Sequence, residues 1–164
     1  LCELQPQAFA QLKSSIGADR RAKLFAMDGY MGLRAFIPPP ERRGLVLVDP
    51  PYEKEAEWET AAEAVAGAWR KWAAGVYVLW YPVKDNRAPA AIARIFARRG
   101  VRRTLRLELQ IGPPLTAGKL ARCGMILINP PFRLAEEAKI LLPWLALILE
   151  SEESSFLIDW LSGE

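Results

Sequence analysis

Apolar and polar residues alternate along the chain in two different rhythms. An uninterrupted aliphatic run at 45–48 and a second apolar run at 76–81 predict parallel strands buried on both faces. Between them apolar positions recur every three or four residues, which predicts an amphipathic helix with three tryptophans in the core. These positions are Trp58, Ala62, Val65, Trp69 and Trp72.

The other elements are bounded by glycine and proline. Leucines at 105, 107 and 109 alternate with charged and polar residues, which predicts a half-exposed edge strand in an antiparallel pair. The succession of strands and helices indicates an open α/β sheet with helices on both faces. We expect further helices at 6–16, at 89–99 and around Pro143, and further strands at 1–4, 22–27, 125–128 and 156–161.

Composition narrows the function classes. The 164 residues are 51% hydrophobic and 25% charged, which fits an ordinary globular domain. The chain has no histidine, which excludes a Ser-His-Asp triad and a histidine metal site. Cys2 and Cys123 are too far apart for a metal-binding pair, so we expect no metal and a reducing cytoplasm. The apolar runs fall well short of the ~20 residues that span a bilayer, so we expect no membrane segment.

The charge distribution adds a mild preference for polyanions. The formal net charge is +3, with basic clusters at 20–23, 42–43 and 98–106. Solvated surface accounts for any one of these clusters. A glycine- and proline-rich loop at 112–124 carries Lys119 and Arg122. We interpret it either as a contact for RNA phosphates or as a mobile surface hairpin.

Candidate chemistry lies where strands end, because ligands of open α/β sheets bind beyond the carboxyl ends of the strands. Glu3 at such a position suits the hydroxyls of a ribose, and Asp28 suits an adenine ring that Gly29 lets the backbone approach. An ordinary cap of a helix or turn explains either acid equally well. The residues after strands are Glu3, Asp28 with Gly29, 49–52, 81–82 and 129–132.

The tetrapeptide at 49–52, Asp-Pro-Pro-Tyr, is the most specific of these signals. Consecutive prolines force a rigid turn, which leaves the Asp49 carboxylate and the Pro50 carbonyl as acceptors aimed at one point. Two acceptors beside the ring of Tyr52 suit the exocyclic amino group of a flipped adenine. Holding both N–H groups exposes the nitrogen lone pair to a sulfonium methyl donor, and Asp49 takes the proton as it leaves.

At these residues the chain resembles the amino-methyltransferases, and in particular the RlmJ type of bacterial 23S ribosomal RNA adenine-N6 methyltransferases. The similarity runs through essentially the whole chain in the expected order. The matching segments are 1–6 (LCELQP), 27–30 (MDGY), 43–52 (RGLVLVDPPY), 75–82 (GVYVLWYP) and 124–132 (GMILINPPF).

The resemblance implies a Rossmann-like methyltransferase fold with a mostly parallel sheet and an antiparallel edge. It implies S-adenosylmethionine as cofactor, bound by Glu3, Asp28, Gly29 and Asp49, and catalysis by Asp49 with Pro50 and Tyr52. The implied partner is 23S rRNA, naked or partly assembled, and we expect a monomer. The family's glycine-rich cofactor loop and its first strand have no counterpart here. We therefore expect 1–164 to be the C-terminal portion of one catalytic domain, to be inactive alone and to bind S-adenosylmethionine weakly or not at all.

Three alternatives remain open. Asn129-Pro130-Pro131-Phe132 also satisfies the amino-methyltransferase pattern, although it comes late in the strand order and a rigid turn explains it better. The substrate of such a motif is alternatively DNA adenine or a protein glutamine. A non-catalytic nucleic-acid-binding or uptake-related module is a function of another class, and the intact motif at 49–52 argues against it.

Overall fold

The structure, a computed structural model, describes residues 1–54, 56–84, 87–112, 120–149 and 154–163. The chain divides into two compact units, Leu1–Pro39 and Pro40–Glu164, which are described separately below. Among the described residues no helix is long and apolar enough to cross a membrane.

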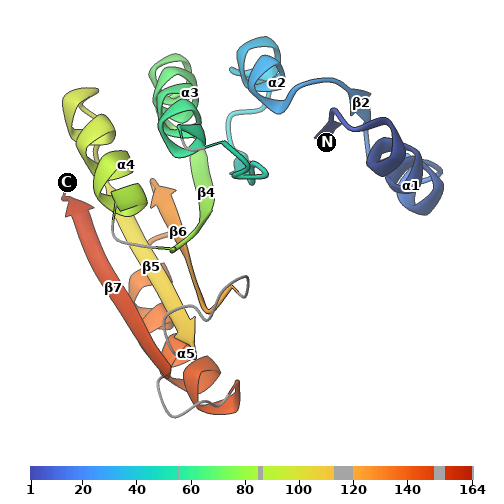
Figure 1. Cartoon of the computed structure of the whole chain (residues 1–164). Coiled ribbons are helices and arrows are strands. Elements are labelled where there is room, and N and C mark those ends of the chain that lie inside the picture. Colours follow the sequence, from blue (N-terminus) through green and yellow to red (C-terminus); the bar gives the residue numbers. More distant parts are fainter. Residues whose placement is uncertain (55, 85–86, 113–119, 150–153, 164) are drawn as a thin grey trace. The chain divides into compact units, whose positions relative to one another are not determined.

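The first unit is a small two-stranded parallel sheet with two helices (Figure 1). Glu3 lies opposite Ala26, so both strands end at the same edge. The helix predicted at 6–16 is present, with Pro6 in its first turn, where the missing N–H costs nothing. Residues 29–36 form a helix that hydrophobic periodicity did not predict. The elements are β1 (Cys2–Glu3), α1 (Pro6–Ile16), β2 (Phe25–Ala26) and α2 (Gly29–Phe36).

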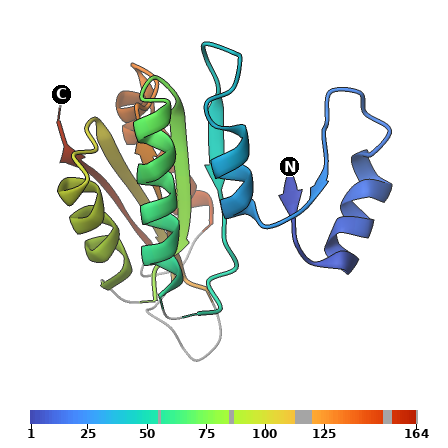
Figure 2. The same ribbon diagram turned by 90° about the horizontal axis from the view of Figure 1, so that it is seen from above.

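The second unit is a five-stranded sheet in the order β3-β4-β6-β5-β7. Figure 2 shows α3 and α4 on one face of the sheet and α5 on the other. Buried apolar side chains of α3, α4, β4 and β6 form the core, and α3 packs on β4 and α4. The strands are β3 (Leu45–Val48), β4 (Val76–Pro82), β5 (Thr104–Ile111), β6 (Arg122–Ile128) and β7 (Ser154–Ser162), and the helices are α3 (Glu57–Lys71), α4 (Arg87–Arg98) and α5 (Leu134–Ile148).

The predicted amphipathic helix forms as α3, with Ala62 and Val65 fully buried. The prediction that its three tryptophans lie in the core is wrong, because each is only half-buried and Trp72 is the C-cap that follows the helix. The predicted helix at 89–99 is present as α4, and Gly100 follows it in the left-handed conformation (φ +70°). Among the methyltransferase-like features expected, an α/β sheet covered on both faces is therefore confirmed.

The sheet is less parallel than expected. Among the described strands only β1–β2 and β3–β4 are parallel, whereas β6 pairs antiparallel with both β4 and β5, and β7 pairs antiparallel with β5. The antiparallel part is thus more than an edge. The reason is the short connection between β5 and β6, because a hairpin joins antiparallel neighbours and a parallel crossover needs a dozen or more residues.

The prediction that 45–48 is buried on both faces is wrong in this structure. Among the described residues β3 pairs only with β4, and Leu45 and Leu47 are each 62% exposed. Val48, on the alternate face, is buried. One face of β3 is thus covered and the other is open, which an uninterrupted aliphatic run does not distinguish from full burial.

Candidate active site

Asp49 lies directly after β3, at the edge of the sheet where the parallel strands β3 and β4 end. Asp49 is exposed, and its side chain accepts no hydrogen bond from the described part of the protein. The next residue, Pro50, is buried, which fixes the backbone on which the carboxylate stands. Partial burial raises the pKa of the Asp49 carboxyl. The position therefore offers an anionic acceptor with room in front of it.

Tyr52, the last residue of the 49–52 turn, points its side chain into the protein. Its backbone is left-handed (φ 53°), its hydroxyl donates to the Trp80 carbonyl, and its ring lies 6.0 Å from the Trp80 ring at 57°. Only 8% of Tyr52 is exposed. The open stacking face expected of Tyr52 is therefore not presented here. The side chain instead ties the Asp49 turn to the end of β4.

The segment after the turn is anchored to α3. The carboxylate of Glu57, in the first turn of α3, accepts hydrogen bonds from the backbone N–H groups of Glu53 at 3.1 Å and Lys54 at 3.5 Å. A carboxylate in the first turn also suits the helix dipole. The C-terminal end of the Asp49 turn is thus held twice, by β4 through Tyr52 and by α3 through Glu57.

In the first unit, Glu3 is the last residue of β1 and Asp28 comes two residues after β2, so both lie where the parallel pair ends. One oxygen of Glu3 accepts from the Gln5 N–H at 2.7 Å, and one oxygen of Asp28 accepts from the N–H groups of Tyr30 and Met31 as the N-cap of α2. Each carboxylate therefore has a local structural role, which agrees with the alternative that each acid caps a helix or a turn. The second oxygen of each has no partner among the described residues.

Gly29, beside Asp28, adds open space to this edge. A Cβ atom at Gly29 would meet no atom within 4 Å. Two half-occupied carboxylates next to open space fit the hydroxyl and amino groups of a nucleoside.

Asn129 lies at the opposite edge of the five-stranded sheet from Asp49. It follows β6, which runs antiparallel to β4, so the end of β6 coincides with the beginning of β4. The Asn129 amide donates to the carbonyls of Ala73 at 2.7 Å and Gly75 at 2.9 Å, and its backbone is left-handed (φ 52°). The second Pro-Pro motif is therefore built into a turn, and strand direction separates it from the Asp49 edge.

A buried charge network lies beside the Asp49 edge, and sequence reasoning missed it. Glu108 was expected on the exposed side of its strand but is only 1% exposed. It accepts a hydrogen bond from the Tyr81 hydroxyl at 2.7 Å and pairs with the guanidinium of Arg122. Burial, and next the hydrogen bond to Glu108, raise the pKa of Tyr81, so this hydroxyl remains a donor.

Gly124 makes that network possible. It lies between Tyr81 and Glu108 in the sheet, and the two side chains meet above it. A Cβ atom at Gly124 would lie 2.5 Å from the Tyr81 ring and 2.8 Å from the Glu108 side chain. The sequence signal that could have revealed the network is a glycine within a strand, opposite a charged residue on the neighbouring strand.

The loop residues 113–119, including Lys119, lie outside the described residues, and Arg122 is engaged with Glu108.

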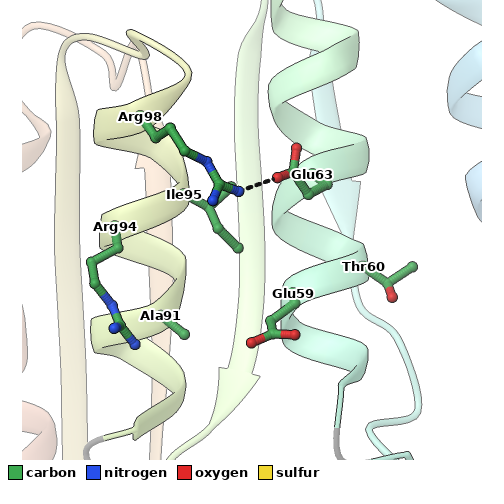
Figure 3. Close-up of a pocket in the computed structure, with 7 residues that line it drawn as sticks. All are labelled: Glu59, Thr60, Glu63, Ala91, Arg94, Ile95 and Arg98. Atoms are coloured by element: carbon green, nitrogen blue, oxygen red, sulfur yellow. Dashed lines mark hydrogen bonds and ion pairs between the residues drawn. The ribbon is translucent and has the colours of Figure 1, made fainter.

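A surface pocket of about 640 Å³ lies elsewhere, between α3 and α4. Figure 3 shows Arg98 reaching across it to Glu63, and Arg99 pairs with the same carboxylate. The hydrogen bond from Arg99 lowers the pKa of Glu63. The pocket contains none of the predicted site residues. Its lining is Glu59, Thr60, Glu63, Ala91, Arg94, Ile95 and Arg98.

No group of histidine, cysteine, aspartate and glutamate within the described ranges is arranged to hold a metal ion.

Known proteins resemble this chain along its length. The family model described as ribosomal RNA large subunit methyltransferase D, RlmJ, matches residues 1–162. The ribosomal RNA large subunit methyltransferase J of Escherichia coli K12 is 36% identical over 145 residues, which are 88% of this chain and 52% of the relative. Its namesake from Haemophilus influenzae is 32% identical over 165 residues, 100% of this chain and 59% of the relative.

A solved structure agrees with the fold. The crystal structure of protein LPL1258 from Legionella pneumophila has a TM-score of 0.87 and 31% identity, covering 98% of this chain and 59% of that one. The chain spans little more than half the length of the relatives it matches. Its mixed sheet with helices on both faces is of the Rossmann-like methyltransferase kind, and the chain belongs to the RlmJ family of ribosomal RNA large subunit methyltransferases.

Proposed function

We propose that the protein of which this chain forms part or all transfers a methyl group from S-adenosylmethionine to N6 of an adenine in 23S ribosomal RNA. Family membership supports rRNA methylation, because the matched relatives carry that name. The Asp49 turn supports an amino group as the acceptor. The observation that carries the proposal is the exposed Asp49 carboxylate, which has no partner among the described residues and stands on a turn fixed by Tyr52 and Glu57.

The chemistry follows from that geometry. An exocyclic amino nitrogen is a poor nucleophile, because its lone pair is delocalised into the ring. Accepting its two N–H bonds with the Asp49 carboxylate and the Pro50 carbonyl favours a pyramidal nitrogen and a localised lone pair. Asp49 stabilises the developing positive charge and accepts the proton that leaves. The rigid turn contributes by holding both acceptors in place before the base arrives.

Glu3, Asp28 and Gly29 are the proposed cofactor-binding residues, together with Asp49. The unpartnered oxygens of the two acids and the space at Gly29 fit the adenosine part of S-adenosylmethionine. When bound, the cofactor supplies an electrophilic methyl group on its sulfonium. We propose further that both units belong to one catalytic domain, which acts as a monomer in the cytoplasm.

The substrate is tested by mass spectrometry of rRNA. Cells lacking the complete gene should lose one N6-methyladenine from 23S rRNA, and the complete protein should restore it in naked rRNA. Duplex DNA and release-factor-like peptides test the other amino acceptors. Unchanged rRNA methylation in the deletion strain would favour a non-catalytic module. Methylation confined to DNA or to the peptide would show that this molecule, and not 23S rRNA, is the substrate.

A further inference from the structure

Two arginine clusters that are far apart in the sequence meet at one edge of the five-stranded sheet. This edge, here called the basic edge, consists of segments 41–44, 70–75, 98–103 and 129–133. It is the edge at which β3, β4 and β5 begin and β6 ends, opposite Asp49. In Figure 2 the turns from α3 to β4 and from α4 to β5 lie at the top, together with the end of β7.

Backbone hydrogen bonds hold these segments against one another. The Val76 N–H donates to the Gly44 carbonyl at 3.1 Å, and the Asn129 N–H donates to the Arg103 carbonyl at 3.0 Å. The Asn129 side chain donates to the carbonyls of Ala73 and Gly75. Asn129 therefore joins the turn before β4 to the turn before β5, and the basic edge is one surface.

The basic edge is far more positive than the chain as a whole. Its nine cations face four carboxylates from the edge and the adjoining helices, namely Glu41, Glu63, Glu136 and Glu137. The whole chain carries only +3, so the remainder of the chain is net negative. Like charges concentrated on one surface repel one another and oppose folding. The uneven charge distribution therefore indicates that this surface binds a negatively charged ligand. The cations are Arg42, Arg43, Arg70, Lys71, Arg98, Arg99, Arg102, Arg103 and Arg133.

Helix dipoles explain only part of this surplus. Arg70, Lys71 and Arg98 are in the last turns of α3 and α4, where cations are favoured. Arg42 and Arg43 precede a strand, and Arg133 is the N-cap of α5, where a cation opposes the dipole. Arg42 and Arg43 therefore carry positive charge that no helix end stabilises, and Arg133 carries it against the dipole, with Glu137 at 4.0 Å as an exposed partner.

Four of the arginines have no carboxylate partner in the part of the chain that the structure describes. Glu63 engages Arg98 at 2.6 Å and Arg99 at 2.8 Å (Figure 3). By contrast, the exposed side chains of Arg42, Arg43, Arg70 and Arg102 form no ion pair within the described ranges. A guanidinium presents a planar fork of donors that matches phosphate oxygens.

An aromatic ring lies fully in solvent beside these arginines. Phe132, the last residue of the second Pro-Pro motif, is 94% exposed and adjoins Arg133. Exposed aromatic rings next to cations are the means by which proteins bind unpaired nucleic acid, through base stacking and phosphate contacts. The ring favours RNA over an acidic protein, which would need the charges alone.

We propose that the basic edge is a second RNA-binding surface, where Phe132 stacks on an unpaired base and the unpaired arginines bind flanking phosphates. The inference rests on the proposed function for its substrate, 23S rRNA. The seven residues of β4 place the basic edge about 20 Å from the Asp49 edge. That exceeds the Debye length of about 8–10 Å, so the basic edge acts by direct contact with another part of the folded RNA.

Binding of a fluorescently labelled RNA stem–loop with unpaired adenines, followed by anisotropy over a range of KCl concentrations, tests this. The triple variant Arg42→Gln, Arg43→Gln, Arg102→Gln should weaken binding and reduce the slope of log K against log salt by about 0.7–0.9 per lost phosphate contact. Phe132→Ala should weaken binding about 5- to 100-fold with an unchanged slope. The matched control replaces the exposed cations Lys13, Arg20 and Lys23 with glutamine and should bind like the wild type.

In the complete protein the same edge variants should raise KM for rRNA and leave kcat unchanged, whereas Asp49→Ala should abolish methyl transfer and leave RNA binding intact. Edge variants that match the control in affinity, slope and KM overturn the inference, even if Asp49→Ala confirms the proposed function. Binding of polyglutamate in place of RNA, or no RNA binding by the wild type, overturns it as well.

Discussion

Gly124→Ala is the substitution whose effect the structure defines most closely. The new methyl group would lie 2.5 Å from Cζ and 2.6 Å from the hydroxyl oxygen of Tyr81, and 2.8 Å from Cγ of Glu108. Real Cβ atoms do not approach other atoms so closely. Tyr81 is fully buried on β4, so its ring has no free space into which to move.

The expected cost has two sources. Forcing a methyl group into a packed core costs about 1–3 kcal/mol. Moving Tyr81 also breaks its hydrogen bond to Glu108, the ion-pair partner of Arg122, and hydrogen bonds to charged groups are worth about 1.5–3 kcal/mol. Because the two displacements overlap, we expect a loss of about 3–5 kcal/mol. That is a large part of the ~5–15 kcal/mol that stabilises a typical domain.

Urea unfolding followed by circular dichroism measures this cost, with Gly67→Ala as the matched control. A Cβ atom at Gly67, inside α3, would meet nothing within 4 Å, so alanine should stabilise the helix by about 0.5–1 kcal/mol. Tyr81→Phe should cost less in the Gly124→Ala background than in the wild type. A loss below ~1 kcal/mol for Gly124→Ala, with additive effects, would refute the described packing of the network.

Three further predictions concern the two edges and the cofactor. Because burial raises the pKa of Asp49, ionisation of this group opposes folding above that pKa. Asp49→Asn should therefore unfold at a slightly higher urea concentration than the wild type at pH 7. This difference should shrink as the pH falls through the pKa of Asp49 in the folded protein. The opposite trend would contradict the raised pKa of Asp49. Asn129→Ala should cost about 2–4 kcal/mol, because it strands two carbonyls and places alanine at φ 52°, and an unchanged urea midpoint would disprove its role as the link of the basic edge. Calorimetric titration of this 164-residue chain with S-adenosylmethionine should give weak binding or none, because the chain spans little more than half the length of its relatives, and micromolar affinity would contradict this expectation.

The elements with strong local signals are the ones that sequence patterns predicted well. The tryptophan stripe at three- and four-residue steps has one structural solution, and α3 is that helix. Pro6 and Gly100 mark the helix boundaries that their backbone preferences favour. Asp28 shows where such patterns fail, because a helix N-cap and a ligand-binding residue require the same carboxylate at the same position.

Features that depend on the partner of a strand were not predictable from the pattern. Glu108 alternates with leucines and so was expected in solvent, but Gly124 on the neighbouring strand leaves space for its carboxylate and for Tyr81. Likewise, the strand order in the sequence favoured Asp49 over Asn129 but did not locate the second Pro-Pro motif in the fold. Only the antiparallel pairing of β6 assigns Asn129 and Phe132 to the edge opposite Asp49.

Methyl transfer by the complete protein carrying Asp49→Ala or Asn129→Ala, assayed on naked 23S rRNA at saturating RNA, tests the central claim most directly. Removing the carboxylate that polarises the amino group should lower kcat by at least ~10²-fold. The Asn129 variant, once its folded fraction is measured, should retain a wild-type kcat per folded molecule. Full activity of Asp49→Ala, or loss of activity confined to Asn129→Ala, would contradict the account.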